Sequence, residues 1–308
     1  MIEKLSVLVI TRNRAKMLAE CLNSLVSQAR KPDRVIVVDN ASTDKTRDFV
    51  LSFQKRLSIK YVYEKQIGIP FARNKGVQHA IGSLLLMIDD DCKASKFWIQ
   101  RVVKAHKKYP KAWAIQGRTF GLPKDQLYSL LAQFHRYLSL QKYLKTNQPF
   151  QVKHFLNKGF TTEMAIAICD TRNFSVKISY LKKYKLSFDE RFYRGSDSDF
   201  ARQIAQQNGL IMFCPYVQVH HRERSSLAQF LMQRWHIGRT EARMADKWKS
   251  PSSARSIPWP KVLLTLFLFC HVSKKWNNLP ILILLLFFDR FSYLNGWFYE
   301  KRYSVLKR

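Results

Sequence analysis

The chain has 308 residues, 46% of them hydrophobic, with only 10 Gly and 10 Pro, so it is predicted to be folded throughout around one large core or two smaller ones. Its formal net charge of +31 favours polyanionic partners such as nucleic acid, anionic lipid or phosphorylated substrates, unless the charge serves solubility alone. The five scattered Cys exclude a disulfide framework and are typical of a cytosolic protein. The N-terminal residues do not resemble a signal peptide.

The first hundred residues are predicted to alternate strands with helices. Apolar runs predict strands at 5–10, 34–38, 59–63 and 83–88. Helical spacing and the position of Pro70 predict helices at 18–26, at 46–54, from 70 onward and at 98–106. Repeated strand–helix units indicate an α/β fold with a mixed, mainly parallel sheet and helices on both faces.

The middle of the chain has a less regular pattern. An amphipathic helix is expected over 127–138, and short strand-like runs occur at 164–168 and 210–213. A helix is predicted over 199–207, where Asn208-Gly209 ends it.

The C-terminal region is basic and apolar in turn. Residues 225–249 predict a basic amphipathic helix, and 262–272 and 279–288 are apolar runs of about half the length that spans a bilayer. Aromatic and basic flanks favour a membrane interface, although two core helices of a soluble protein or an imperfectly spanning hairpin also fit. We therefore predict that 226–308 associates with an anionic membrane surface, peripheral or monotopic on its cytoplasmic face.

An acidic triplet ends the fourth predicted strand, in Leu84-Leu-Leu-Met-Ile-Asp-Asp-Asp91. Open α/β sheets bind ligands at the carboxyl ends of their strands. If strand geometry continues that far, Asp89 and Asp91 share one face and suit a divalent cation that also holds a phosphate. The alternative is an acidic turn that caps the next helix.

Five segments together resemble glycosyltransferase family 2. They are Val7-Leu-Val-Ile-Thr-Arg-Asn-Arg14, Val37-Val-Asp-Asn-Ala-Ser-Thr-Asp44, Gly68-Ile-Pro-Phe-Ala-Arg-Asn-Lys-Gly76, the triplet at 89–91, and Phe188-Asp-Glu-Arg-Phe-Tyr-Arg-Gly-Ser-Asp-Ser-Asp199. The resemblance covers roughly residues 5–240. It implies a GT-A catalytic domain over 1–225, with a nucleotide-sugar half at 1–120 and an acceptor half at 121–225. It also implies inverting transfer from a nucleotide-diphosphosugar to a hydroxyl of a glycan or lipid-linked acceptor.

The resemblance assigns expected roles to residues of the donor and acceptor sites. Thr11 and Asp39 are expected at the nucleobase, where Asp39 can accept from an imide N–H, although both residues also suit loop or helix capping. The full set expected to bind the nucleotide or substrate is Thr11, Asn13, Asp39, Arg73, Asn74, Asp89, Asp90 and Asn173. Within it, Arg73 is expected near the diphosphate or base, Asn74 is expected to order the loop, and Asn173 is expected to line the acceptor pocket.

Metal binding is expected at Asp91, with Mg²⁺ or Mn²⁺ as the cofactor. Oxygen ligands argue against structural zinc. The resemblance also implies a His near the metal or diphosphate, and the sequence offers His220 and His221 without a basis for choosing between them.

Asp197 is the expected general base, because an inverting transfer needs a carboxylate that takes the proton of the acceptor hydroxyl. Asp199 is expected to orient the site or to begin a helix. The family commonly has Glu before this base, whereas this chain has Ser196. Asp189 and Glu190 are alternatives, in a segment that reads better as a structural turn.

Two other classes of protein compete with this interpretation. The charge suits a nucleic-acid-binding protein, but no helix-turn-helix, RNA-binding motif or zinc finger is legible, so no nucleic-acid partner is expected. A nucleotidyltransferase uses a similar sheet, but it should have a Gly-rich triphosphate loop, and Thr11-Arg-Asn-Arg14 lacks glycine.

Overall fold

The computed structural model describes most of the chain, in two compact units. Its described residues are 4–122, 130, 131, 134, 149–151, 170–192, 194–222, 226–249, 262–264, 266, 267, 270, 271 and 276–305. The first unit comprises Met1–Phe120, Asn147–Leu156 and Ile168–His221, and the second comprises Gly121–Thr146, Asn157–Ala167 and Arg222–Arg308. The expected catalytic domain over 1–225 stays a prediction.

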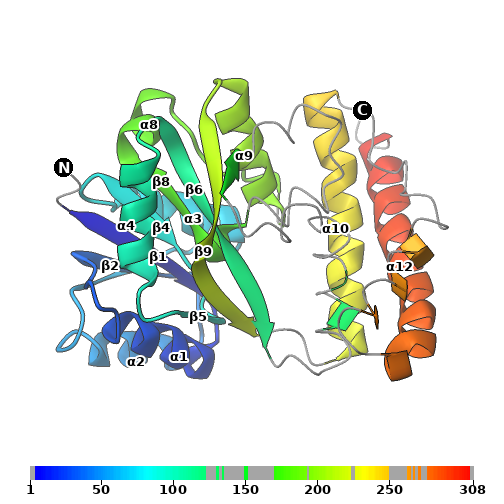
Figure 1. Cartoon of the computed structure of the whole chain (residues 1–308), viewed down its shortest axis with the longest axis horizontal. Coiled ribbons are helices and arrows are strands. Elements are labelled where there is room, and N and C mark those ends of the chain that lie inside the picture. The colour runs from blue at the N-terminus through cyan, green and yellow to red at the C-terminus, as the bar shows by residue number, and fades with distance from the viewer. Residues whose placement is uncertain are drawn as a thin grey trace. The chain divides into compact units, whose positions relative to one another are not determined.

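A nine-stranded sheet runs through the first unit in the order β3-β2-β1-β4-β8-β6-β9-β5, with β7 also paired to β9 (Figure 1). Its first four strands are parallel: β1 (Leu5–Thr11), β2 (Arg34–Asp39), β3 (Ile59–Tyr63) and β4 (Leu84–Met87). Each lies within one residue of its predicted bounds at either end. Residues of both faces are buried along β1, β2 and β4, which is why these strands read as continuous apolar runs.

The other half of the sheet is antiparallel wherever its strand pairing is described. It contains β5 (Cys92–Ala94), β6 (Ala112–Leu122), β7 (Phe150–Gln151), β8 (Phe174–Lys177) and β9 (Leu210–Arg222). The predicted mixed α/β sheet is confirmed, and its parallel part is the first half. Strand β9 is longer than the predicted run at 210–213, because its second half alternates apolar and polar residues.

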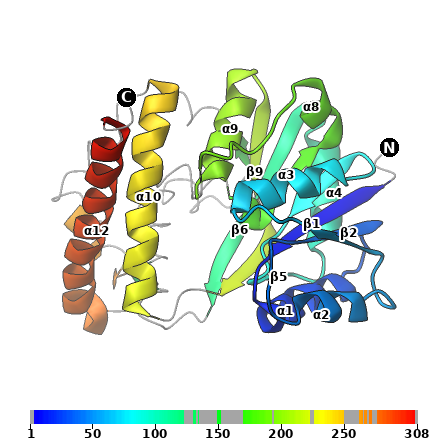
Figure 2. The ribbon, with the colours of Figure 1, turned by 180° about the vertical axis from the view of Figure 1, so that it is seen from behind.

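Helices cover both faces of the parallel strands. Their bounds are α1 (Ala15–Val26), α2 (Thr46–Ser52), α3 (Ile69–Gln78) and α4 (Trp98–Lys108). Side chains of α1 and α4 share a core cluster with Val7 and Val35. The opposite face meets α3, where a Cβ on Gly76 would lie 2.2 Å from a methyl group of Leu8. Figure 2 shows α3 in front of the sheet.

Three short elements follow the parallel half. The 3-10 helix η1 (Thr171–Asn173) leads into β8, and α8 (Ile178–Lys183) follows that strand. Helix α9 (Ser196–Gln206) begins three residues before its predicted start at 199, so Asp197 lies in its first turn.

His106 gives the first unit a pH-dependent stability. Its Nε2 atom lies 3.0 Å from Ser175 Oγ, and burial, with the charge of Lys177, lowers the pKa of His106 to about 3. Above pH ~6.5 the ring is neutral in both folded and unfolded chains; below it only the unfolded chain gains the proton. We expect the unfolding free energy to fall by about 2 kcal/mol between pH 7 and pH 5.

Urea unfolding at the two pH values measures this loss. His106→Gln should be less stable at pH 7 and should lose most of the pH dependence. His79→Gln, a change at a residue that is only partly buried, should retain it. Equal pH dependence in both variants would contradict the assignment.

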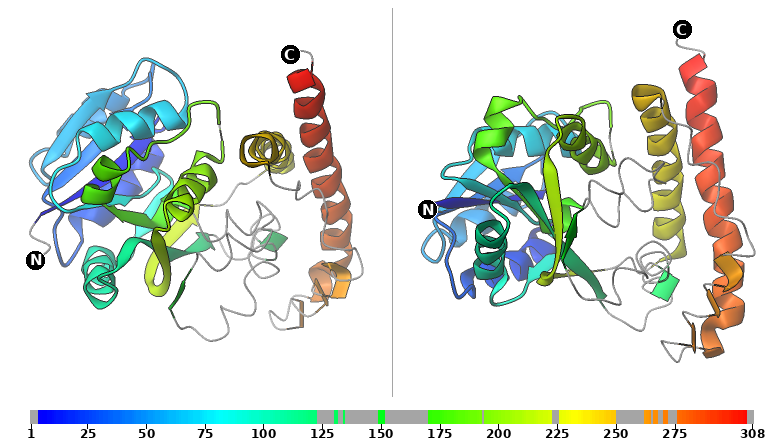
Figure 3. Two further views of the ribbon diagram at one scale, coloured as in Figure 1. Left: turned by 90° about the horizontal axis from the view of Figure 1, so that it is seen from above. Right: turned by 45° about the horizontal axis from the view of Figure 1, so that its top comes forward.

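The described part of the second unit is mainly a pair of long helices. They are α10 (Leu227–Trp248) and α12 (Leu279–Val305), which pack against each other; the left view of Figure 3 looks along α10 and shows α12 lengthwise. The short helix η2 (Trp276–Asn278) precedes α12. Ser226 caps α10 by accepting a hydrogen bond from the Gln229 amide. The basic helix predicted at 225–249 is therefore present as α10.

The apolar run at 279–288 is not the separate half-length helix that the sequence suggested. It is the first part of a 27-residue helix, because mostly helix-forming residues continue beyond it and no Pro interrupts them. One segment of the described chain, Trp276–Arg302, has the length and composition of a membrane span. The predicted strand at 164–168 and most of the predicted helix at 127–138 lie outside the described residues. Seven of the eleven residues of the apolar run at 262–272 are described, and these are helical.

Candidate active site

Three strand ends bring polar side chains to one edge of the parallel sheet. Strand β1 ends at Thr11, which lies in register with Asp39 at the end of β2, and β4 ends just before the acidic triplet. Because neighbouring parallel strands share direction, their carboxyl ends form one ligand-binding edge.

The acidic triplet lies in a turn, since β4 stops at Met87, so the expected sharing of one strand face by Asp89 and Asp91 is wrong. Asp89 lies 3.7 Å from the guanidinium of Arg73. Asp90 accepts from the Thr11 hydroxyl at 2.8 Å and from Arg14 at 3.2 Å. Asp91 accepts from Arg14 at 3.4 Å. The turn thus directs Asp89 to Arg73, and Asp90 and Asp91 to Arg14.

The three carboxyl groups differ in acidity. Burial raises the pKa of Asp89 to about 6 and that of Asp90 to about 7. Burial also acts on Asp91, but the hydrogen bond and charge of His221, with the charge of Arg14, outweigh it and lower the pKa of Asp91 below its usual range. Asp91 is therefore the carboxylate of the triplet held most firmly in its ionised form.

His221 and His220 point to opposite sides of β9. His221 lies opposite Cys92, and its Nε2 atom is 3.5 Å from Asp91 Oδ1. The His220 ring stacks on Phe120, with 5.5 Å between ring centroids. Strand alternation thus places His221, and not His220, beside Asp91.

The donor set beside Asp91 fits a divalent cation that is completed by a ligand. One carboxylate oxygen and one imidazole nitrogen suit Mn²⁺, and the oxygen also suits Mg²⁺. Within the part of the chain that the structure describes, no three His, Cys, Asp or Glu side chains gather as a closed metal cluster. An open set of this kind leaves coordination positions for phosphate oxygens and water.

Arg14 is a site residue that the sequence did not single out. Its guanidinium donates to Asp90 and Asp91 together. Its position in the loop after β1 could have indicated this role, because β1 and β4 are parallel neighbours and their carboxyl ends lie at the same sheet edge.

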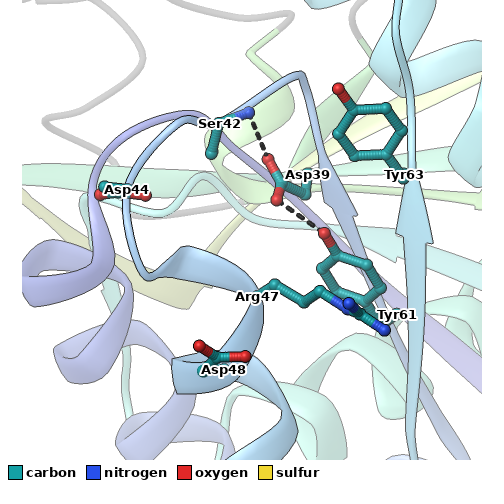
Figure 4. Close-up of a pocket in the computed structure, with 7 residues that line it drawn as sticks. All are labelled: Asp39, Ser42, Asp44, Arg47, Asp48, Tyr61 and Tyr63. Carbon is teal, nitrogen blue, oxygen red and sulfur yellow. Dashed lines mark hydrogen bonds between the residues drawn. The ribbon is translucent and has the colours of Figure 1, made fainter.

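A pocket of about 610 Å³ lies at the end of β2. It is lined by Asp39, Ser42, Asp44, Arg47, Asp48, Tyr61 and Tyr63 (Figure 4). Asp39 accepts hydrogen bonds from the Ser42 amide at 2.9 Å and from the Tyr61 hydroxyl at 2.7 Å. Burial and the bond to Asp39 raise the pKa of Tyr61, so its hydroxyl stays a donor and orients the carboxylate.

Thr11 and Asn13 lie beside this pocket but do not line it. The Thr11 hydroxyl donates to Asp90, and Thr11 is not among the residues that line the pocket, whereas the resemblance had placed Thr11 at the nucleobase. Asn13 has a positive φ of 53° and links two loops. Its side-chain oxygen accepts from the Thr43 backbone amide at 2.7 Å, and its backbone N–H donates to the Ser42 hydroxyl oxygen. Both residues shape the loops around Asp39.

Tyr61→Phe is expected to raise the KM for the nucleotide-sugar donor about fivefold while kcat stays near the wild-type value. The change removes one hydrogen bond to a charged group, and with it the fixed orientation of Asp39. Steady-state kinetics measures the effect. Tyr63→Phe, which removes the other tyrosine hydroxyl of the same pocket, is the matched control and should change KM less. A fall in kcat alone would contradict a role in donor binding.

Arg73 and Asn74 project from α3 toward the segment 188–199, which contains Asp197. The buried Arg73 guanidinium donates to Ser196 Oγ at 3.2 Å, packs over the Phe188 ring and reaches Asp89. Asn74 donates to the Phe188 carbonyl and accepts from the Phe188 amide, both at 2.8 Å. Asn74 thus fastens the backbone at Phe188, and its expected role in ordering the loop stays a prediction.

Asp197 lies in the same electrostatic environment as the triplet. Burial raises its pKa, while Arg73 and Arg172 act against this rise. The charge of Arg172 also opposes the rise in the pKa of Asp89 and contributes to the lowered pKa of Asp91. One cation therefore acts on carboxylates of both motifs. Its position is fixed by a bidentate ion pair with Asp170. Geometry links the two motifs through Arg73, which lies 3.7 Å from Asp89 and donates to Ser196 beside Asp197.

Neighbouring acids of the second motif have structural partners. Asp189 pairs with Arg191 within the turn that precedes α9, as its sequence pattern suggested. Glu190 lies 3.4 Å from the Asn74 amide nitrogen. The fully buried Asp199 accepts from Gln203 at 2.8 Å, one turn later in α9.

Asn173 differs from its expected place in an acceptor pocket. It is buried, accepts from the Trp98 indole at 2.8 Å and donates to the carbonyls of Arg118 and Val217 at 3.0 Å. These bonds use both of its N–H groups to join β6, β9 and α4. The short polar side chain was read as a ligand contact, but it satisfies backbone groups of the core.

The family model for glycosyl transferase family 2 matches residues 6–168, more than half of the chain. The chain belongs to glycosyltransferase family 2. This confirms the family inferred from the sequence motifs.

Curated relatives share sequence with this family member. Validoxylamine A glucosyltransferase of Streptomyces hygroscopicus subsp. limoneus is 36% identical over 138 residues, 42% of this chain and 30% of the relative. Chondroitin synthase of Escherichia coli is 25% identical over 72% of this chain and 35% of the relative. Succinoglycan biosynthesis protein ExoM of Rhizobium meliloti is 27% identical over 75% and 72%. The chain spans about a third of the length of the first two relatives.

Solved structures share the fold of this family member. The mannosyltransferase PcManGT of Pyrobaculum calidifontis, in complex with GDP-Man and Mn²⁺, is 17% identical with a TM-score of 0.60, over 99% of this chain and 88% of that one. S. aureus TarS 1-349 with UDP-GlcNAc is also 17% identical, with a TM-score of 0.57 over 98% and 92%. These likenesses confirm the predicted GT-A fold class.

Proposed function

We propose that the chain is an inverting glycosyltransferase that moves a sugar from a nucleotide-diphosphosugar to a hydroxyl of a membrane-linked glycan or lipid. The observation that carries the proposal is the buried Arg73, which lies 3.7 Å from Asp89 of the triplet and donates at 3.2 Å to Ser196, the residue before Asp197. An ionised carboxylate for the departing diphosphate and a separate carboxylate for the acceptor then belong to one site, as a single displacement requires.

The pocket around Asp39 is proposed to hold the nucleobase. Both carboxylate oxygens are oriented by donors, and a carboxylate can only accept hydrogen bonds. A base that offers a ring N–H, such as uracil or guanine, is therefore preferred over one that offers a ring acceptor. The complexes of TarS with UDP-GlcNAc and of PcManGT with GDP-Man contain donors of these two kinds.

Asp91 and His221 are proposed to hold Mg²⁺ or Mn²⁺, and Asp89 and Asp90 are proposed to contact ribose or metal-bound water. When bound, the cation supplies positive charge that stabilises the diphosphate leaving group. Arg14 and Arg73 contribute fixed positive charge at the same place. Their guanidinium groups need no reorganisation as negative charge develops on the leaving group.

Asp197 is proposed to accept the proton of the acceptor hydroxyl. The acceptor oxygen forms a bond to the anomeric carbon while the bond from that carbon to the diphosphate breaks, which inverts the configuration. Burial raises the pKa of Asp197, which makes the carboxylate a stronger base than an exposed one. Ser196, which replaces the Glu common in the family, leaves the base itself in place.

The second unit is proposed to bring the enzyme to its acceptor at the cytoplasmic face of an anionic membrane. The motivating observations are the net charge of +31 and the apolar helix α12. Chondroitin synthase and ExoM carry names that refer to polysaccharide synthesis. A glycan or lipid held at a membrane is the acceptor class that fits these observations.

A panel of nucleotide-sugars tests the donor proposal. UDP-, GDP-, CDP- and ADP-sugars are each added with Mn²⁺, Mg²⁺ or EDTA, and thermal shift and donor hydrolysis are measured. We expect a UDP- or GDP-sugar to stabilise and react only with a cation. Stabilisation by nucleoside triphosphates alone, or by DNA or RNA at moderate salt, would instead favour a nucleotidyltransferase or a nucleic-acid-binding protein.

A further inference from the structure

Helix α12 carries its exposed large apolar side chains along one side. These residues, called here the outer face, are Ile281, Leu284, Phe287, Phe288, Phe291 and Phe298, and they are between 43% and 69% exposed. Most are three or four positions apart, so they form a stripe along the helix. Contiguous exposed apolar surface of this kind indicates a binding site.

The opposite side of α12 becomes polar in its second half and faces α10. Asp289 pairs with Arg234, and Tyr293 donates to Glu241. Further along, Glu300 accepts from Arg239 at 2.8 Å and from Arg243 at 2.6 Å. The polarity of this half is thus inverted, with ion pairs inside and Phe outside.

Two glycines keep this polar interface tight. A Cβ on Gly238 would lie 2.0 Å from the Tyr293 carbonyl oxygen, and one on Gly296 would lie 2.0 Å from the Trp235 carbonyl oxygen. Close backbone packing at small residues and polar contacts between helices are typical of helices in an apolar medium. Exposure of the Phe side chains of the outer face to water is unfavourable, so an apolar medium accounts for it better.

A transmembrane orientation does not suit this pair. Asp289 and Arg290 lie near the middle of α12, and α10 contains Arg234, His236, Arg239, Glu241, Arg243, Asp246 and Lys247. Charges at the centre of a bilayer are costly, and ion pairs bind α12 to α10 along their shared length. An orientation parallel to the surface keeps α10 in the headgroup region and lets only the outer face reach the acyl chains.

We propose that the outer face of α12 inserts into the acyl-chain region of an anionic bilayer, with α10 and α12 lying in the plane of the interface. Basic residues outnumber acidic ones in both helices, which suits anionic headgroups. The proposal deepens the membrane-linked acceptor of the proposed function, but it is tested without any acceptor.

Flotation of the full-length protein with vesicles tests the insertion. Vesicles of phosphatidylcholine with phosphatidylglycerol should bind the wild type more strongly than phosphatidylcholine alone. Phe288→Ser combined with Phe291→Ser should lower the partition coefficient at least about tenfold while donor hydrolysis and circular dichroism stay unchanged. Phe97→Ser, at a 44%-exposed Phe of the first unit, is the matched control and should float as the wild type does.

Orientation is tested by labelling protein bound to sealed vesicles with an impermeant maleimide. Asn277→Cys and Arg302→Cys, near the two ends of the helix, should both be labelled if α12 lies in the interface. Labelling of one end only would overturn the in-plane orientation. Unchanged flotation of the double Phe variant would overturn the insertion. A wild-type protein that binds no vesicles and forms a dimer, which the double Phe substitution converts to a monomer, would overturn it too. Absence of donor hydrolysis by the wild-type protein would count against the proposed function alone.

Discussion

Asp91→Asn is expected to abolish metal-dependent binding of the nucleotide-sugar and to lower kcat/KM by about a thousandfold, or roughly 4 kcal/mol. The reason is the acidity of Asp91, which His221 and Arg14 hold ionised despite burial. An amide is a poorer ligand for a hard cation and cannot compensate its charge. Calorimetric titration of nucleoside diphosphate, with Mn²⁺ and with EDTA, measures the loss.

Asp90→Asn is the control for Asp91→Asn, since it changes the neighbouring carboxylate. Asp90 is directed to Thr11 and Arg14, and an Asn can still accept from the Thr11 hydroxyl. We expect a loss of about tenfold, because one charged hydrogen bond is weakened. If the two variants had equal activity, Asp91 would have no special place in the triplet.

Asp197→Asn is expected to leave donor affinity within about twofold of the wild type and to lower the rate of sugar transfer about a thousandfold. The amide cannot accept the proton of the acceptor hydroxyl, whereas Arg73 and Arg172 still hold the donor side of the site. Single-turnover transfer, together with titration of the donor, separates the two effects.

Asp199→Asn gives the contrast for the base. Asp199 is fully buried and bonded to Gln203 within α9, so its replacement should lower the melting temperature more than the transfer rate. A thousandfold loss of transfer in Asp199→Asn, with full activity in Asp197→Asn, would move the base to Asp199.

The sequence predicted the parallel half of the sheet well, since β1, β2 and β4 are buried on both faces and their apolar runs are continuous. The bounds of β3 were predicted without error. The end of β4 was harder to predict, because Ile88 is buried like the strand before it although the chain has already turned. That turn, and not a strand face, decides where the three carboxylates point.

The partners of the site residues depended on contacts that are distant in sequence. The register between β5 and β9 selects His221 over His220, and no local pattern contains this register. Arg14 and Tyr61 join the site only through the adjacency of strand ends. Asn173 was mistaken for a ligand contact, because a short polar side chain that satisfies core backbone groups has the same sequence signal as one that lines a pocket.

Anomalous diffraction from crystals grown with Mn²⁺ and a nucleoside diphosphate tests the central claim most directly. The account predicts one manganese peak coordinated by Asp91 and His221, with the diphosphate bound to the same ion and Asp197 facing the cavity that would hold the sugar. A manganese ion bound to other residues, or a diphosphate that lies in a cavity without Asp197, would contradict it.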